Sequence, residues 1–377
     1  MNKVKIIGIV GGGQLGRMLT QAAVTLGFQV VVVNPSGNSP AAQVGADEIV
    51  ADLYDETALR ELGKVSDVIT VEIEHLDTSV LEVVAKTGKH VHPSPATIRL
   101  IQDKYQQKLF LKKADIPTAD FVEIKTPADA KKALKTFDGK MLLKTKHGAY
   151  DGRGNAVVAN QQEIDAAVKR FADKQLYAEK FVPFTNELAV MVARSTTGEI
   201  KTYPVTETFH ERNICVETHT PAQISLDAVK KAEDLAVVAA EKLKGAGVFG
   251  IEMFLTADSE VLVNEIAPRV HNSGHYTIEA CETSQFEQHI RAVTGMKLGK
   301  TKLKVPAAVM INILGEQDGD TVVSGLENAQ KIPETFVHIY GKSPTKIDRK
   351  MGHITSTGKT ITEAQARARQ ARKSISI

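Results

Sequence analysis

The sequence is poor in cysteine, in net charge and in long apolar segments. Its two cysteines, Cys215 and Cys281, lie far apart without metal-ligand spacing, so we expect two buried thiols rather than a disulfide or a zinc site. The 47 basic and 45 acidic residues leave a formal charge of +2, which indicates no strong polyanion-binding surface. No apolar run reaches membrane-spanning length, and no repeat or low-complexity segment is present.

The length and the opening residues give the expected number of domains and the expected cellular location. A chain of 377 residues is too long for one ordinary core and indicates two or three domains. The opening MNKVKIIGIV is charged and lacks the apolar core and cleavage site of a signal peptide. A cytoplasmic location is therefore expected.

The N-terminal region reads as a β-α-β unit. The apolar run Val4 to Val10 precedes Gly11-Gly12-Gly13-Gln14-Leu15-Gly16, a helical pattern continues to Leu26, and a second strand follows. A dinucleotide site would need an acidic residue after that strand, where Asn34 stands. The glycines therefore favour a phosphate-tolerant or merely tight-packing turn over an NAD site. Further along, Glu72 and Glu74 end another strand, as ligand-facing groups or solvated acids.

The segment His92-Pro93-Ser94-Pro95 marks a boundary, and one helix is expected over 97–114. The next unit has expected strands at 121–124 and 140–145 around a helix at 127–136. Lys144 precedes a long glycine-rich loop, 146–155, which suits either a phosphate-closing lid or a floppy hairpin. The strand that starts at Leu176 runs into an extended connection, followed by Glu187, and a scaffold helix is expected over 227–243.

A hairpin of two β-runs, Val248 to Leu255 and Glu260 to Ile266, carries the main chemical signal. With a four-residue loop, Thr256 pairs with Val261 and Glu252 faces Glu265. Facing carboxylates among apolar residues repel each other, so a hard cation such as Mg²⁺ is the simplest partner, whereas two solvated glutamates are the alternative.

Two polar loops lie downstream. The tail from Asn264 to His275 contains Arg269, two histidines, two asparagines and Ser273 directly after a buried strand, and it suits an anionic substrate. The basic loop 341–353 is either a phosphate clamp or a solvated turn.

Several motifs together resemble one enzyme family. They are GGGQLGRM at 11–18, YDGRGN at 150–155, NEIAPRVHNSGHYTIEAC at 264–281, SQFEQHIRAVTG at 284–295, and YGK with RKMGH within 340–353. In this collinear order the chain resembles the N5-carboxyaminoimidazole ribonucleotide synthetases of the ATP-grasp superfamily over nearly its whole length.

The resemblance implies an α/β fold with three parts. These are a Rossmann-like pre-ATP-grasp domain over 1–96, an ATP-grasp domain over 97–298 with a lid subdomain at about 115–182, and a small β-rich C-terminal domain over 299–377. It also implies a ligase reaction, in which ATP, bicarbonate and 5-aminoimidazole ribonucleotide give ADP, phosphate and the N5-carbamate through carboxyphosphate. ATP and Mg²⁺ are the implied cofactors, and a homodimer without nucleic-acid or membrane partners is the implied state.

The resemblance also assigns residues to roles. For ATP these are Lys104, Lys144, Ala149, Tyr150, Asp151, Gly152, Arg153, Gly154, Asn155, Glu179, Lys180, Phe181, Val182, Glu187, His210, Asn264 and Glu265. For Mg²⁺ they are Glu252 and Glu265. For the ribonucleotide they are Tyr150, Asp151, Arg153, Asn272, Ser273, Lys342, Arg349 and Lys350. Arg269 and His271 are the implied catalytic pair, stabilising bicarbonate and carboxyphosphate.

Three positions depart from the family pattern. Lys104 stands where Arg is common, His75 where Asn is usual, and Asn155 where Gln is usual. Three other functions stay open: a formate-using glycinamide ribonucleotide transformylase, an NAD-dependent dehydrogenase, and a nucleotide-binding regulator without turnover.

Overall fold

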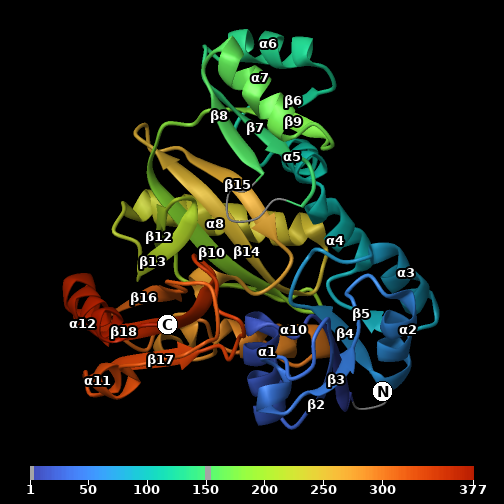
Figure 1. Ribbon diagram of the computed structural model, residues 1–377, viewed down its shortest axis with the longest axis vertical. Helices are drawn as coiled ribbons and strands as arrows, with labels where there is room; N and C mark the ends of the chain where they lie inside the picture. Colours follow the sequence, from blue (N-terminus) through green and yellow to red (C-terminus); the bar gives the residue numbers. More distant parts are fainter. Residues whose placement is uncertain (1–3, 149–153) are drawn as a thin grey trace.

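The computed structural model describes residues 4–148 and 154–377, and within them the strands form three sheets (Figure 1). The two smaller sheets belong to the first half of the chain, and the largest belongs to the second half. None of the helices in these ranges has the length and hydrophobicity needed to cross a membrane. Cys215 and Cys281 are buried and form no disulfide, as predicted, and burial raises the pKa of Cys281 to about 12.

The N-terminal sheet is parallel, with strand order β3-β2-β1-β4-β5. Its inner strands are runs of Ile and Val, because helices cover both faces of such a sheet. The elements are β1 (Ile6–Val10), α1 (Gln14–Thr25), β2 (Gln29–Asn34), η1 (Ala42–Val44), β3 (Asp47–Val50), α2 (Glu56–Val65), β4 (Val68–Val71), α3 (Thr78–Lys86) and β5 (His90–Val91).

The glycine turn before α1 is occupied by a side chain of the protein itself. The Glu72 carboxylate accepts hydrogen bonds from the backbone N–H groups of Gly13 (2.5 Å) and Gly16 (2.6 Å). A Cβ on Gly11 would lie 2.4 Å from Glu72 Cγ, and one on Gly13 would lie 2.7 Å from Glu72 Oε1. The glycines therefore admit a carboxylate where a dinucleotide fold admits a phosphate, which argues against the NAD interpretation.

The prediction of a single helix over 97–114 is wrong. The segment forms two helices, α4 (Pro95–Gln102) and α5 (Lys104–Lys113). Asp103 separates them in an extended conformation and caps α5 by accepting from the N–H groups of Tyr105 and Gln106. An aspartate is a strong N-cap, so it starts a new helix here. As a result, Lys104 occupies the first position of α5.

A four-stranded antiparallel sheet follows, in the order β6-β9-β7-β8. Its helices pack through Ala130, Ala133, Ile164 and Ala167 onto the sheet residues Met141 and Leu143. The elements are β6 (Phe121–Ile124), α6 (Pro127–Thr136), β7 (Met141–Thr145), β8 (Asn155–Val158), α7 (Gln161–Arg170) and β9 (Leu176–Lys180). The predicted strand at 121–124 and helix at 127–136 are confirmed.

The largest sheet runs in the order β15-β14-β10-β12-β13-β16-β18-β17, with β11 paired to β10. Its elements are β10 (Phe184–Arg194), β11 (Ile200–Thr202), β12 (Thr206–Glu211), β13 (Ile214–Thr220), α8 (Leu226–Leu243), β14 (Gly247–Thr256), β15 (Val261–Ala267), η2 (Asn272–Gly274), α9 (Thr277–Ala280), α10 (Gln285–Thr294), β16 (Ala307–Leu314), α11 (Leu326–Gln330), β17 (Thr335–Ile339), β18 (Lys350–Gly358) and α12 (Ile361–Ser374).

The C-terminal strands continue this sheet, because β16 pairs antiparallel with β13. Helix α8 covers one face of β10 and β14 through an alanine stripe, and α10 packs beside α1 of the N-terminal region (Figure 1). The predicted domain boundaries near residues 96 and 298 stay predictions.

Candidate active site

The two facing carboxylates are present in the hairpin of β14 and β15. Glu252 lies opposite Glu265, as predicted, but the expected pairing of Thr256 with Val261 is wrong, since Val261 pairs with Leu255. A β-bulge between these points restores the register by placing the extra residue, Asn264, next to Glu265. The Thr256 N–H donates to the Glu260 carbonyl at 3.0 Å, so the turn is one residue shorter than expected. The shorter turn and the bulge cancel, and the carboxylates still face each other.

The oxygen atoms at the bulge fit a hard cation. The side chains of Glu252 and Glu265 are 33% and 38% exposed. Burial raises the pKa of Glu252, and the Glu265 carboxylate raises it further. Asn264 Oδ1 is buried and has no hydrogen-bond partner among the described residues. Two carboxylates and an unpartnered amide oxygen form the donor set that Mg²⁺ prefers.

Lysines approach this pair and the neighbouring sheet. Lys104 Nζ lies 2.5 Å from Glu265 Oε1. Glu179, in β9, contacts Lys144 Nζ at 2.9 Å and Lys108 Nζ at 3.1 Å. Burial alone would raise the pKa of Glu179, but the two lysines lower it overall.

Lys108 was missed by the sequence analysis, since nothing in the α5 pattern separates it from the neighbouring lysines. Burial lowers its pKa to about 8, and the Glu179 carboxylate opposes that shift. The side chain of Glu179, predicted to bind adenine, is thus fully engaged in holding two lysines.

The predicted nucleotide end of the site lies on β9, β10 and β12. Glu187 and His210 come together in an ion pair. Burial by itself lowers the pKa of His210, but the Glu187 carboxylate outweighs it, and the pKa is raised. In the extended connection, Lys180 Nζ lies 2.8 Å from Asp138, and Lys140 Nζ lies 3.7 Å from the centre of the Phe181 ring. Val182 follows and is half-buried.

Arg269 is held from the N-terminal region. Its Nε and Nη2 atoms donate to the two oxygens of Glu74, at 2.5 and 3.1 Å, and its Nη1 donates to the Val270 carbonyl at 3.2 Å. Burial alone would raise the pKa of Glu74, but the Arg269 guanidinium lowers it to about 2. Three of the five N–H bonds of Arg269 are used within the described part of the chain, which leaves two for an anion.

His271 is neutral and fixed by its surroundings. Its Nδ1 lies 2.8 Å from Ser273 Oγ, and its Nε2 lies 3.5 Å from Glu252 Oε1. Burial lowers the pKa of His271 to about 3, and the charges of Arg269 and Lys350 lower it in the same direction. The cationic side chain of this pair is therefore Arg269, whereas His271 offers a neutral imidazole.

A buried glutamine holds the His271 backbone. Gln285 Oε1 accepts from the His271 N–H at 2.9 Å, and its Nε2 donates to the His271 carbonyl at 2.7 Å. Gln107 makes the same two contacts with Ile266, next to Glu265, at 2.8 and 3.0 Å. The sequence analysis missed both glutamines, because a buried Gln in a helix carries no local signature.

The remaining predicted ribonucleotide contacts differ in how free their side chains are. Asn272 is buried, and its amide exchanges two hydrogen bonds with Asn312, at 2.9 and 2.7 Å, while Ser273 is buried against His271. Lys342 Nζ contacts Gln14 and donates to the Lys350 carbonyl at 2.8 Å. Arg349 Nη1 donates to the Pro344 carbonyl at 2.6 Å.

The C-terminal basic loop therefore reaches the site. Lys342 meets the glycine turn through Gln14, and the Lys350 charge acts on both His271 and His210. This placement supports the clamp interpretation over a solvated basic turn.

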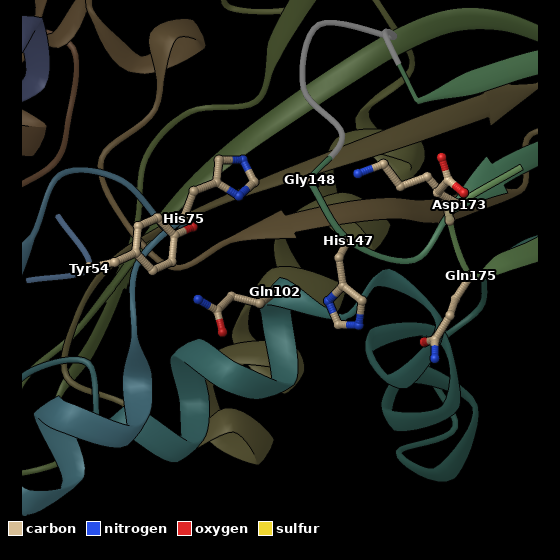
Figure 2. Close-up of a pocket in the computed structure, with 8 residues that line it drawn as sticks. Tyr54, His75, Gln102, His147, Gly148, Asp173 and Gln175 are labelled. Carbon is tan, nitrogen blue, oxygen red and sulfur yellow. The ribbon is translucent and has the colours of Figure 1, made fainter. Parts of the chain in front are cut away.

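A cavity of about 390 Å³ lies between the N-terminal region and the four-stranded sheet. Figure 2 shows His75 and Gln102 on one side and His147 and Gln175 on the other. Gln102 Nε2 donates to the Glu74 carbonyl at 2.5 Å, so the cavity lies beside the Glu74–Arg269 pair. Its volume is within the usual range for a small-molecule pocket, about 300–1,000 Å³.

Five of the predicted loop residues, Ala149, Tyr150, Asp151, Gly152 and Arg153, lie outside the described residues. Of the other two, Gly154 is buried and its carbonyl accepts from the Thr145 N–H at 2.9 Å, while Asn155 pairs with Lys144. Both ends of the loop 146–155 therefore lie close to Lys144.

The chain matches three family models in order along its length. They are the ribonucleotide synthetase preATP-grasp domain over residues 4–102, the ATP-grasp domain over 109–286, and the phosphoribosylaminoimidazole carboxylase C-terminal domain over 308–367.

Individual relatives cover nearly the whole chain. It is 41% identical over 350 residues to the N5-carboxyaminoimidazole ribonucleotide synthase of Bacillus subtilis, covering 93% of this chain and 90% of that protein. It is 43% identical over 374 residues to the phosphoribosylaminoimidazole carboxylase of Schizosaccharomyces pombe, and it spans 67% of that longer protein. The solved N5-carboxyaminoimidazole synthase from Aspergillus clavatus, in complex with ADP and 5-aminoimidazole ribonucleotide, is 40% identical, with a TM-score of 0.92 and 99% of each chain covered.

Proposed function

The chain belongs to the N5-carboxyaminoimidazole ribonucleotide synthase family of ATP-grasp ligases, and we propose that it uses ATP to carboxylate 5-aminoimidazole ribonucleotide with bicarbonate. In this reaction a bicarbonate oxygen attacks the γ-phosphorus of ATP, ADP leaves, and carboxyphosphate forms. The exocyclic amine of the ribonucleotide then takes the carboxyl group, directly or as CO₂, with loss of phosphate and of a proton. The product is the N5-carbamate, an intermediate of purine synthesis.

The facing carboxylates carry this proposal. Glu252, Glu265 and Asn264 would hold Mg²⁺, which neutralises charge on the phosphate oxygens of ATP. Lys104 lies against Glu265, and Lys144 is kept in place by Glu179, so both cations are positioned for phosphates. A phosphoryl-transfer site needs this combination of oxygen ligands and fixed positive charge.

The rest of the nucleotide would lie along β9 and β10. Lys180, Phe181 and Val182 would line the adenine with backbone groups, and Glu187 with His210 would hold the ribose. Gly154 and Asn155, with residues 149–153 before them, would close over the phosphates.

Bicarbonate would bind between Arg269 and His271. Two N–H bonds of Arg269 have no hydrogen-bond partner among the described residues, and they would donate to a bicarbonate or carboxyphosphate oxygen. The neutral His271 is close to Glu252 and can accept a proton at Nε2 or donate one there. Both groups thus lie beside the metal ligands, where carboxyphosphate would form.

The ribonucleotide phosphate would meet Lys342, Arg349 and Lys350, and Asn272 and Ser273 would shape the pocket wall through their buried side chains. Tyr150, Asp151 and Arg153 stay predicted contacts. Residues 1–96, 97–298 and 299–377 would each contribute one wall of this site.

The direct test is phosphate release from ATP with each acid and each ribonucleotide supplied separately. Full rate should require both bicarbonate and 5-aminoimidazole ribonucleotide. A full rate of phosphate release with formate and glycinamide ribonucleotide would favour the transformylase hypothesis instead. ATP binding without substrate-stimulated turnover would indicate a nucleotide-binding regulator. NADH binding would support the hypothesis of an NAD-dependent dehydrogenase.

Two finer statements accompany the function as proposals. We place the protein in the cytoplasm, where its two free cysteines stay reduced. We also propose a homodimer, which light scattering of the purified chain tests directly.

A further inference from the structure

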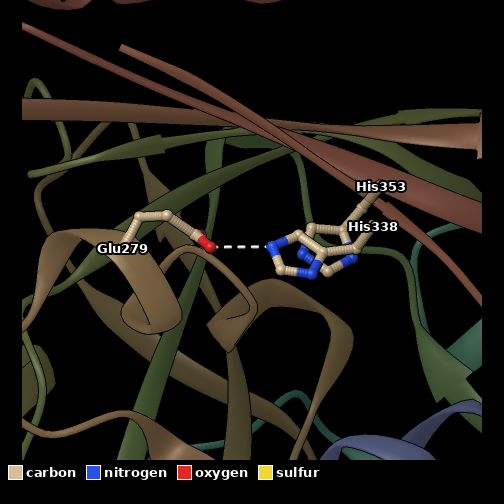
Figure 3. Close-up of side chains that lie close together, drawn as sticks. All are labelled: Glu279, His338 and His353. Atoms are coloured by element: carbon tan, nitrogen blue, oxygen red, sulfur yellow. Dashed lines mark hydrogen bonds and ion pairs between the residues drawn. The ribbon is translucent and has the colours of Figure 1, made fainter. Parts of the chain in front are cut away.

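Three side chains that the proposed reaction does not use gather between a short helix and the C-terminal strands. Glu279 projects from α9, His338 from β17 and His353 from β18, as Figure 3 shows. One ligand atom from each lies within 4.8 Å of the other two. The three residues come from separate elements, so the fold, not local sequence, brings them together.

The hydrogen bonds of this cluster are incomplete. His338 Nε2 lies 2.7 Å from Glu279 Oε1, and His353 Nδ1 lies 2.9 Å from the Tyr340 hydroxyl. Glu279 Oε2 and His353 Nε2 are buried without a hydrogen-bond partner among the described residues. Buried polar atoms in folded proteins are nearly always hydrogen-bonded, because leaving them unpaired costs free energy, so a missing partner is indicated.

The backbone holds the two histidines in place. His338 lies directly opposite His353 in the antiparallel pair of β17 and β18, and their rings stack at 4.4 Å between centroids. If Tyr340 accepts a hydrogen bond from His353 Nδ1, the free electron pair lies on Nε2. Fixing one ring nitrogen so that the other can ligate is the usual arrangement around a metal.

We propose that Glu279, His338 and His353 bind a divalent transition-metal ion, with Zn²⁺ as the best match. Two imidazoles and one carboxylate select zinc-like ions over Mg²⁺, which prefers oxygen ligands. The buried and unpartnered His275 Nε2 belongs to a ring 4.8 Å from the His353 ring, which makes it a candidate fourth ligand.

Binding requires a modest closure of the cluster. Two atoms that are each about 2.1 Å from one zinc ion are at most about 4.2 Å apart. Rotation of the His338 ring, whose side chain is 30% exposed, and of the Glu279 carboxylate would supply this movement. The ion would replace the proton that His338 and Glu279 now share, and it would enter from the exposed His338 side.

The test measures zinc binding by the full chain, and it is independent of the proposed carboxylation. The protein is stripped with a chelator and titrated with Zn²⁺ against a chromophoric chelator, and bound metal is counted by mass spectrometry. Wild type should bind one equivalent, and His338→Gln should bind it at least about tenfold more weakly. The Glu265→Gln variant should bind like wild type, which separates this site from the proposed Mg²⁺ site.

His219→Gln is the matched control, because His219 also pairs with a buried carboxylate, Glu217, at 2.5 Å but belongs to no three-ligand group among the described residues. It should bind Zn²⁺ like wild type. Glu279→Gln is the second variant and should also weaken binding, with its fold checked by circular dichroism. Equal zinc affinity in wild type, His338→Gln and Glu279→Gln would overturn the proposal, as would a wild type that binds no zinc.

Discussion

At the scale of single residues, Glu265 has two opposed effects. It supplies a ligand for the proposed Mg²⁺, and it also raises the pKa of Glu252 by repulsion. Glu265→Gln should therefore lower substrate-dependent phosphate release by about 100-fold or more through lost metal binding. The free energy of unfolding should change little, because the repulsion with Glu252 is removed together with the ion pair to Lys104.

The matched control for Glu265→Gln is Glu260→Gln in the same hairpin. The Glu260 side chain is 64% exposed and lies 3.9 Å from Lys231, so its loss should leave turnover and stability nearly unchanged. Normal turnover in Glu265→Gln would remove this residue from the metal site.

Glu74 gives a prediction for acid stability. Its pKa is about 2 in the folded protein and 4.5 ordinarily. The Glu74–Arg269 pair therefore stabilises the fold fully above about pH 4.5, and the contribution is lost as the pH falls toward 2. At neutral pH, Glu74→Gln should reduce the free energy of unfolding by about 3 kcal/mol, at about 1.4 kcal/mol per pKa unit.

Denaturant unfolding at several pH values checks this. The difference between wild type and Glu74→Gln should shrink steadily below pH 4.5. Glu82→Gln is the control, because the exposed Glu82–Arg99 pair should contribute under about 1 kcal/mol. An equal loss in both variants at neutral pH would contradict a special role for Glu74.

At the scale of elements, α10 contains two glutamines that each bind the backbone N–H and carbonyl of one residue, but the residue differs. Gln285 binds both backbone groups of His271, whereas Gln288 binds both backbone groups of Gly299, at 2.8 and 2.9 Å. Methionine has a similar length but cannot replace these hydrogen bonds. Gln285→Met and Gln288→Met should each destabilise the fold by about 1–3 kcal/mol.

The two variants should differ in activity. Gln285→Met should lower kcat by about tenfold or more, because His271 is no longer held against Glu252, while the KM for ATP stays near that of wild type. Gln288→Met should keep a normal kcat in the same assay. Equal kcat losses in the two variants would assign Gln285 a purely structural role.

Most elements could be predicted from hydrophobic periodicity, including the strand at 121–124 and the facing of Glu252 and Glu265. The bulge at Asn264 could not be predicted, because it compensates for a turn that is one residue shorter than expected. The helix break at Asp103 was missed for a similar reason, since an aspartate within a helical pattern reads as a surface residue until its capping contacts are seen.

At the scale of the whole molecule, the candidate site joins residues from every sheet. Glu74 comes from the loop after β4 of the parallel sheet, Lys144 from the four-stranded sheet and Lys350 from the C-terminal extension of the large sheet. Long-range assembly of this kind leaves no pattern in a local window. The grouping therefore followed from the family resemblance, whereas partners such as Lys108 and Gln285 required the structure.

Lys350 offers a test at this scale. Lys350→Ala should raise the KM for 5-aminoimidazole ribonucleotide by about tenfold or more and leave ATP affinity unchanged, because we propose that its charge binds the ribonucleotide phosphate. It should also raise the pKa of His271, since the Lys350 charge lowers it in the wild type.

Steady-state kinetics with each substrate varied, and calorimetry with ATP alone, separate these effects. Lys346→Ala, an exposed position in the same loop, should behave like wild type. Selective loss of ATP binding in Lys350→Ala would place that lysine at the nucleotide instead.

The glutamine contacts also have a consequence for exchange with solvent deuterium. The backbone N–H groups of His271 and Gly299 lie outside the helices and strands, where amide hydrogens usually exchange quickly. Each donates to a buried glutamine, however, so each should exchange as slowly as its strand neighbours. Two slow loop amides would then report, without any substrate, whether α10 is docked.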